Sequence, residues 1–212
     1  MNYNTYRRLI RNKFALSTVV TTLIILVISV LLASVVTYFA INVVSTRVQE
    51  ESLHLTKQHI WHNPLANPGD ADYTLASVMI INTGGRDIVI DKFAVRGQEA
   101  PWNDATDTGK FVLYKITTDP ISADFPFVTT FSATPSGSEN TVTFAEKSYE
   151  FEVAENDLVL PSGYTMLVYI VNPDSITIND IGLTVSITLY TAQAMYYREA
   201  NVQAYTTEGG SS

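Results

Sequence analysis

The chain has 212 residues, no cysteine and a formal net charge of -8. Its only charged residues before position 47 are Arg7, Arg8, Arg11 and Lys13, which leaves 9 basic residues against 21 acidic ones in the remainder. An acidic domain repels phosphate groups, so the composition excludes a nucleic-acid-binding protein. The lack of cysteine excludes disulfides and thiolate sites, so packing and hydrogen bonds must stabilise the fold.

An uncharged, strongly apolar segment follows the basic cluster. No charged residue occurs from Phe14 to Thr46. The apolar region of a secretory signal has about 7–15 residues, roughly half the length of this segment. About 29 residues form a helix of about 44 Å, long enough to cross a hydrocarbon core of about 30 Å. The basic residues before the helix predict a cytoplasmic N-terminus and an external remainder, and a permanent signal anchor is one interpretation.

The residues at the start of this segment suggest a second interpretation. In the sequence Lys13-Phe14-Ala15-Leu16, a basic and a small residue directly precede the apolar run, and a serine and a threonine follow. This junction resembles the class III signal peptide of archaeal type IV pilins and archaellins, which a prepilin peptidase cuts before the apolar segment. The resemblance implies a cut between Ala15 and Leu16, after which the helix is kept.

Small residues lie along one side of the predicted helix. At 100° per residue, five of them fall within about 60° of one another on a helical projection. These are Thr18, Thr22, Ser29, Ala33 and Ala40. Small residues on one face let helix backbones approach closely. The pattern favours a helix-packing face, although lone transmembrane helices also contain small residues.

The helix is expected to continue beyond the apolar part. Residues 47–58 contain no proline or glycine and many good helix formers. Asn63-Pro64 and Asn67-Pro68 are stop signals. The sequence therefore predicts a helix over residues 16–62 and a linker over residues 63–72.

The remainder predicts β-strands. The runs 73–81 and 86–95 flank Asn82-Thr83-Gly84-Gly85, whose glycines are expected to supply the positive φ of a hairpin turn. Residues 181–191 alternate between apolar and small or polar side chains, as in a strand with one buried face. Further β-rich runs are 110–117, 126–134, 141–153, 157–160, 164–171 and 194–204.

The spacing of the turns between these runs predicts an antiparallel Ig-like β-sandwich, and similar heads occur in archaeal pilins. The expected fold class is therefore α+β, with a long apolar N-terminal helix followed by the sandwich head. The expected parts are a basic leader (1–15), the helix (16–62), the linker (63–72), the head (73–205) and a polar tail (206–212).

Motifs for catalysis or cofactor binding are not found in the sequence. The three histidines, His54, His59 and His62, fall at the end of the predicted helix, where their spacing does not place them on one face. Residues 103–109 are similar to a calcium loop, but Lys115 stands where an EF-hand requires a glutamate. We expect a non-enzymatic protein without a metal or cofactor, with solvated histidines.

Two functions remain open at this point. The resemblance implies a structural subunit of an archaeal type IV pilus-like surface filament or archaellum, used for adhesion or motility. Its partners would be further copies of itself in a helical homopolymer, the prepilin peptidase, an assembly ATPase, a membrane platform protein and, before assembly, the membrane. The alternative is a signal-anchored β-sandwich binding module that does not polymerise, such as an archaellum stator component or a minor pilin.

Overall fold

The structure is a computed structural model that describes residues 13–48, 50–64, 73–104, 109–129, 131–134, 140–144 and 146–205. The chain divides into two compact units, Met1–Val48 and Gln49–Ser212. The polar tail, most of the basic leader and residues 65–72 of the predicted linker lie outside the described residues.

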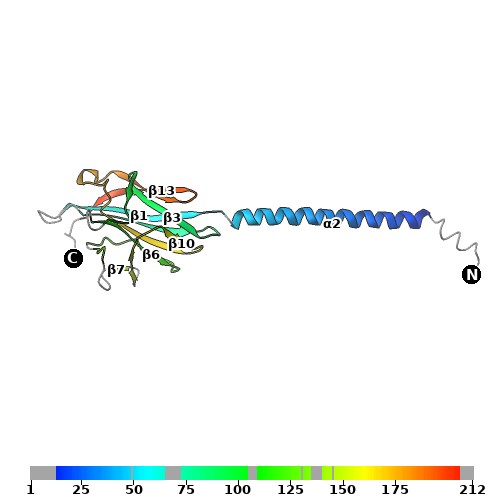
Figure 1. The fold of residues 1–212 in the computed structure, drawn as a ribbon, viewed down its shortest axis with the longest axis horizontal. Coiled ribbons are helices and arrows are strands. Elements are labelled where there is room, and N and C mark those ends of the chain that lie inside the picture. Colours follow the sequence, from blue (N-terminus) through cyan, green and yellow to red (C-terminus); the bar gives the residue numbers. More distant parts are fainter. Residues whose placement is uncertain are drawn as a thin grey trace, which may run out of the picture. The chain divides into compact units, whose positions relative to one another are not determined.

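The first unit contains one long helix, α2 (Lys13–Val48), drawn in blue in Figure 1. It contains no proline and no glycine, so no residue interrupts the backbone hydrogen bonds. The stretch Ser17–Thr46 is long and apolar enough to cross a membrane, by length and composition, and none of it is buried within the chain.

The predicted end of this helix is wrong. The helix ends at Val48, and Leu53–Asn63 forms a β-strand instead. Helix propensity is a weak preference, and here the pairing of this segment with strands from distant parts of the chain overrides it. The boundary between helix and head therefore lies at Val48 and Gln49, before the predicted linker at 63–72.

The second unit, the head, consists almost entirely of β-strands. In chain order its elements are β1 (Leu53–Asn63), β2 (Tyr73–Asn82), β3 (Ile88–Val95), β4 (Gln98–Ala100), β5 (Asn103–Asp104), β6 (Lys110–Thr117), β7 (Thr141–Phe144), β8 (Lys147–Glu150), β9 (Glu152–Val153), β10 (Leu158–Leu160), β11 (Thr165–Val171), a short 3-10 helix η1 (Ile178–Asp180), β12 (Thr184–Thr191) and β13 (Met195–Ala204).

Most of the predicted strands are confirmed, and the run 110–117 coincides with β6. The predicted strand at 126–134 is wrong, since no strand is found in its described residues. This run begins at Pro126, which has no N–H to donate to a ladder. Its aromatic side chains instead cover a face of the sheet, where Phe127 and Phe131 pack against buried residues.

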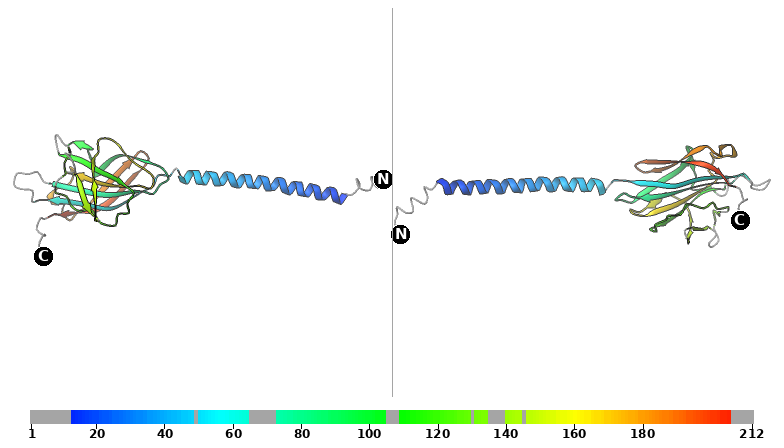
Figure 2. Two further views of the ribbon diagram at one scale, coloured as in Figure 1. Left: turned by 90° about the horizontal axis from the view of Figure 1, so that it is seen from below. Right: turned by 180° about the vertical axis from the view of Figure 1, so that it is seen from behind.

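One sheet of eleven strands forms the body of the head, with β7 and β8 paired separately. Its main path runs β10-β3-β12-β13-β1-β2-β11-β6-β5, so β1 lies in the middle. All pairings in it are antiparallel except that of β1 with β13, which is parallel. Figure 2 shows the strands curling around a common interior. The mostly antiparallel head and the α+β class are confirmed, whereas the Ig-like arrangement of two sheets stays a prediction.

The curled sheet encloses one core and supports a second one on its outer face. The inner core joins both halves of the sheet, and includes Ile60 of β1, Phe93 of β3 and Leu189 of β12. The outer core lies between β2, β11 and β6 and the chain segment 119–153, which supplies Phe125 and Phe151 among others. Strand β2 is apolar along nearly its whole length because its successive side chains alternate between the two cores.

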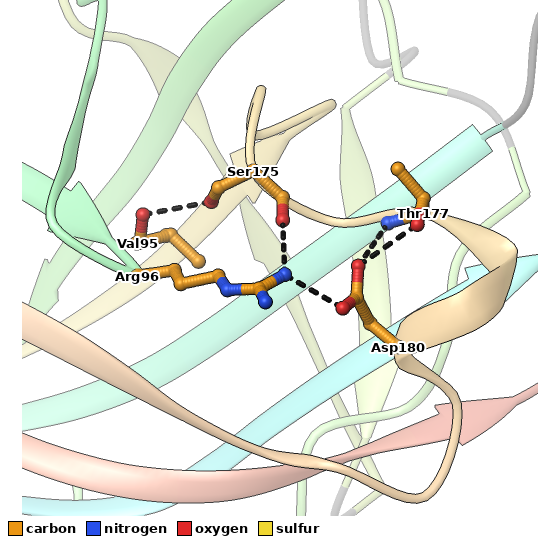
Figure 3. A network of polar contacts seen from close by, with 5 residues as sticks. All are labelled: Val95, Arg96, Ser175, Thr177 and Asp180. Atoms are coloured by element: carbon orange, nitrogen blue, oxygen red, sulfur yellow. Dashed lines mark hydrogen bonds and ion pairs between the residues drawn. The ribbon is translucent and has the colours of Figure 1, made fainter.

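Polar contacts join the loops to this framework. The turn residue Arg96 has a positive φ of 52°, and its guanidinium donates to Ser175 O at 3.2 Å and to Asp180 Oδ1 at 2.6 Å. Asp180 also accepts from the backbone N–H and the hydroxyl of Thr177, at 2.8 and 2.9 Å. Figure 3 shows this network, which connects the β3–β4 turn to the loop before β12.

Candidate functional site: the surface of the apolar helix

The side chains of α2 are apolar around its whole circumference. Eighteen large apolar side chains between Val19 and Val44 are 45–72% exposed in the single chain. A helix that is apolar all round is found in the interior of a protein or in a membrane. The surface of α2 must therefore be covered by lipid or by protein.

Six polar side chains of α2 donate a hydrogen bond to a backbone carbonyl of the helix itself. Ser29 Oγ donates to Ile25 O at 2.7 Å, and Thr22 Oγ1 donates to Val19 O at 2.9 Å. The same kind of bond, at 2.8–3.0 Å, is made by Thr21, Ser34, Asn42 and Thr46. Because these donors have an acceptor within the helix, their transfer to an apolar environment does not carry the free-energy cost of burying an unpaired polar group.

The five predicted packing positions lie on this one uninterrupted helix. Thr18, Thr22, Ser29, Ala33 and Ala40 are all exposed in the single chain. Because α2 runs through all five positions, the helical spacing that places them on one side applies. Contact between this side and another helix stays a prediction.

The predicted processing site falls at the beginning of the helix. Lys13, Phe14, Ala15 and Leu16 form its first four residues. Residues before Lys13 lie outside the described part of the chain, and cleavage between Ala15 and Leu16 stays a prediction.

On the other side of the boundary, residues 50–52 are held firmly by the head. Ser52 O accepts from the N–H groups of Thr83 and Gly84, at 3.0 and 3.1 Å, and the hydroxyls of Ser52 and Thr83 are 2.9 Å apart. The carboxylate of Glu51 accepts a hydrogen bond from Thr191 Oγ1. The backbone carbonyl of Glu51 accepts one from the hydroxyl of Tyr196 at 3.4 Å. Burial and the Glu51 charge raise the pKa of Tyr196 above its ordinary value. The head is thus rigidly connected up to the residues that precede β1.

Gly84 allows this close contact, for a reason that the sequence did not reveal. A Cβ at this position would lie 2.8 Å from Glu50 O and 2.9 Å from Ser52 N. The expected positive φ at Gly84 and Gly85 is not found, because the glycines with positive φ among the described residues are Gly97, Gly109, Gly163 and Gly182. Glycine is needed at position 84 because the backbone of residues 50–52 passes directly over it.

Replacing Gly84 by alanine is expected to destabilise the head by about 1–3 kcal/mol, because both crowded atoms belong to the backbone and cannot rotate away. Gly97→Ala is the control. A Cβ at position 97 would meet no atom within 4 Å. This substitution is therefore expected to lower the free energy of unfolding by about 1 kcal/mol, through the positive φ alone. Chemical denaturation measures both changes. Hydrogen exchange at Thr83 and Gly84, whose N–H groups bind Ser52, should quicken only in Gly84→Ala.

The three histidines lie on β1, so their expected place on a solvated helix end is wrong. His62 is fully buried, with Nδ1 2.9 Å from Thr74 Oγ1. His59 stacks on Trp61, and its Nε2 lies 3.8 Å from Asp124 Oδ1. Among the described residues, no three histidine or acidic side chains converge to hold a metal ion.

Two cavities among the described residues of the head are open to solvent. One of about 380 Å³ is lined by Gln58, Tyr197, Arg198 and Glu199. The other, of about 290 Å³, lies where Pro120 and Ile121 pass over Met79 and Ile81. Neither of these two is lined by a histidine, so neither contains a Ser-His pair.

Comparison with known proteins adds no relative. No protein-family model matches the sequence, and a search of curated proteins finds no match. The features that indicate a function are therefore the apolar surface of α2 and the resemblance at the Lys13–Leu16 junction.

Proposed function

We propose that the chain is the structural subunit of an archaeal type IV pilus-like surface filament. A prepilin peptidase removes residues 1–15, and the helix then leaves the membrane and packs among the helices of other copies. The acidic heads face the outside, as an Ig-like sheath that serves adhesion or motility. An assembly ATPase and a membrane platform protein carry out the transfer.

The observation that carries this proposal is the apolar surface of α2. Burying its eighteen large apolar side chains is worth on the order of 30–50 kcal/mol as an upper bound, so the helix is not stable in water. The stretch Ser17–Thr46 has 30 residues, or about 45 Å of helix, which exceeds a hydrocarbon core of about 30 Å. The basic, small and apolar order of the junction supports cleavage before the helix rather than after it.

The mature N-terminus tests the proposal. Mass spectrometry of the protein purified from cells is expected to give a chain that starts at Leu16. Ala15→Trp should block the cut and the appearance of filaments, because a bulky side chain replaces the small residue at the junction. Ala15→Gly keeps a small residue and should be processed normally.

An intact Met1 in the wild-type protein would contradict the filament proposal and leave the signal-anchored binding module. Electron microscopy of surface structures sheared from the cells then separates the remaining cases. A processed chain that is abundant in filaments is a major subunit, whereas a processed chain that stays in the membrane fraction acts in another role.

A further inference from the structure

The first and last strands of the head lie side by side and run in the same direction. Strand β1 pairs in parallel with β13 through Ile60 with Val202, Trp61 with Gln203 and His62 with Ala204. In a parallel pair the C-terminal ends lie together, so the end of β13 is one strand length away from the beginning of β1. The two points where the chain enters and leaves the head are thus at opposite ends of adjacent strands.

Further bonds join the two strands beyond the ladder itself. Arg198 Nε donates to Leu55 O at 3.2 Å, and Gln58 Nε2 donates to Glu199 O at 3.2 Å. Beyond the ladder, Tyr205 N donates to His62 O at 2.9 Å. The ring of Tyr205 stacks on Phe127, with 3.8 Å between centroids. The contact between β1 and β13 therefore extends along most of β1.

The other edge of β1 has the longer ladder, which is interrupted by one register shift between Thr56 and His59. Strand β2 pairs with it in antiparallel register from Leu53 with Asn82 to Asn63 with Tyr73. Tension applied at residues 50–52 acts along β1, and the interstrand hydrogen bonds run across that direction. Such a load shears the interstrand hydrogen bonds on both edges of β1 at the same time. A load perpendicular to the strands would instead break these hydrogen bonds one after another.

We propose that the head is a load-bearing unit in which β1 and β13 form a shear clamp. Tension that arrives from the helix enters the central strand of the sheet, and the parallel partner resists it from the opposite end. The bonds of Ser52 to the β2–β3 turn hold the entry point in line with β1. This inference does not require polymerisation, because a membrane anchor would load β1 in the same way.

Single-molecule pulling of the full chain in detergent tests the inference. The sequence has no cysteine, so introduced ones define the attachment points. In the shear geometry, the handles join Thr46→Cys and a cysteine added after Ser212. In the control geometry, they join Thr46→Cys and Ser162→Cys. Ser162 lies beside the entry point, since its hydroxyl donates to Gly84 O at 2.7 Å and Gly163 N donates to Asn82 O at 3.1 Å.

The shear geometry is expected to require at least about a twofold higher mean unfolding force than the control geometry at the same loading rate, because forced unfolding follows the barrier along the pulling direction. Denaturant midpoints of the two double-cysteine chains should agree, so that the difference reports direction and not stability. Arg198→Gln should lower the force in the shear geometry alone. Equal forces in the two geometries, or a lower force in the shear geometry, would overturn the shear clamp and leave the proposed filament untouched.

Discussion

Replacing Ser29 by phenylalanine is expected to reduce the yield of sheared surface filaments at least about tenfold, whereas Ser34→Phe leaves most of it. Ser29 lies on the side of α2 that carries the small residues. In the proposed filament, a bulky ring there would separate neighbouring helices at a cost of about 1–3 kcal/mol per contact, and about 1.4 kcal/mol already corresponds to a factor of ten. Because the cost would recur at every subunit, we expect assembly to fail.

The two serines form a closely matched pair. Both are exposed, and both donate to the carbonyl four residues earlier, at 2.7 and 2.8 Å. They differ in direction, since they are about 140° apart on the helical projection. Phenylalanine is apolar, so both variants should remain in the membrane fraction, which checks that only assembly has changed. Equal filament yields from the two variants would contradict a special packing role for the small-residue side.

Asp180→Asn is expected to lower the denaturation midpoint of the head at pH 7. Its carboxylate is 7% exposed and accepts from Thr177 N, Thr177 Oγ1 and Arg96, so the change weakens three bonds in the network of Figure 3. Asp174→Asn is the control. That carboxylate is half exposed and pairs with Lys110, and an exposed ion pair contributes little.

The effect of Asp180→Asn should disappear in acid. The backbone N–H of Thr177, its hydroxyl and Arg96 lower the pKa of Asp180 below its ordinary value. A group with a lowered pKa in the folded state stabilises the fold fully above its unfolded pKa, about 3.9, and loses that contribution as the pH falls through the folded pKa. The difference between the denaturation midpoints of the wild type and the variant should therefore begin to shrink below about pH 4 and vanish once the pH is below the folded pKa. A constant difference from pH 7 to pH 3 would show that Asp180 acts through packing alone.

The helix and the strand β12 could be predicted from short-range patterns of hydrophobicity in the sequence. An uncharged run without proline or glycine predicts the helix that α2 forms, and the alternation in residues 181–191 predicts the strand β12. The first three residues of the predicted run, 181–183, lie outside β12 because the chain turns at Gly182, where φ is +87°. Strand ends depend on such turns, which a pattern of hydrophobicity does not record.

The errors lie where distant parts of the chain decide the outcome. Leu53–Asn63 contains good helix formers, and its strand conformation follows from pairing with β2 and with β13, about 140 residues away. The role of Gly84 depends on the backbone of residues 50–52, and the burial of His62 depends on Thr74 and the inner core. No short-range pattern contains that information, so the sequence located the helix surface but not its attachment to the head.

The parallel pairing of β1 and β13 also determines when the head can fold. The central strand is the first part of the head to leave the ribosome, and one of its partners is the last. Contacts of such long sequence separation form slowly, because a long loop must close before they contribute. Until residues 195–204 have been synthesised, one edge of β1 has no partner strand. A chain truncated before Met195 would therefore keep an open edge at β1, and we expect it to aggregate or be degraded rather than fold.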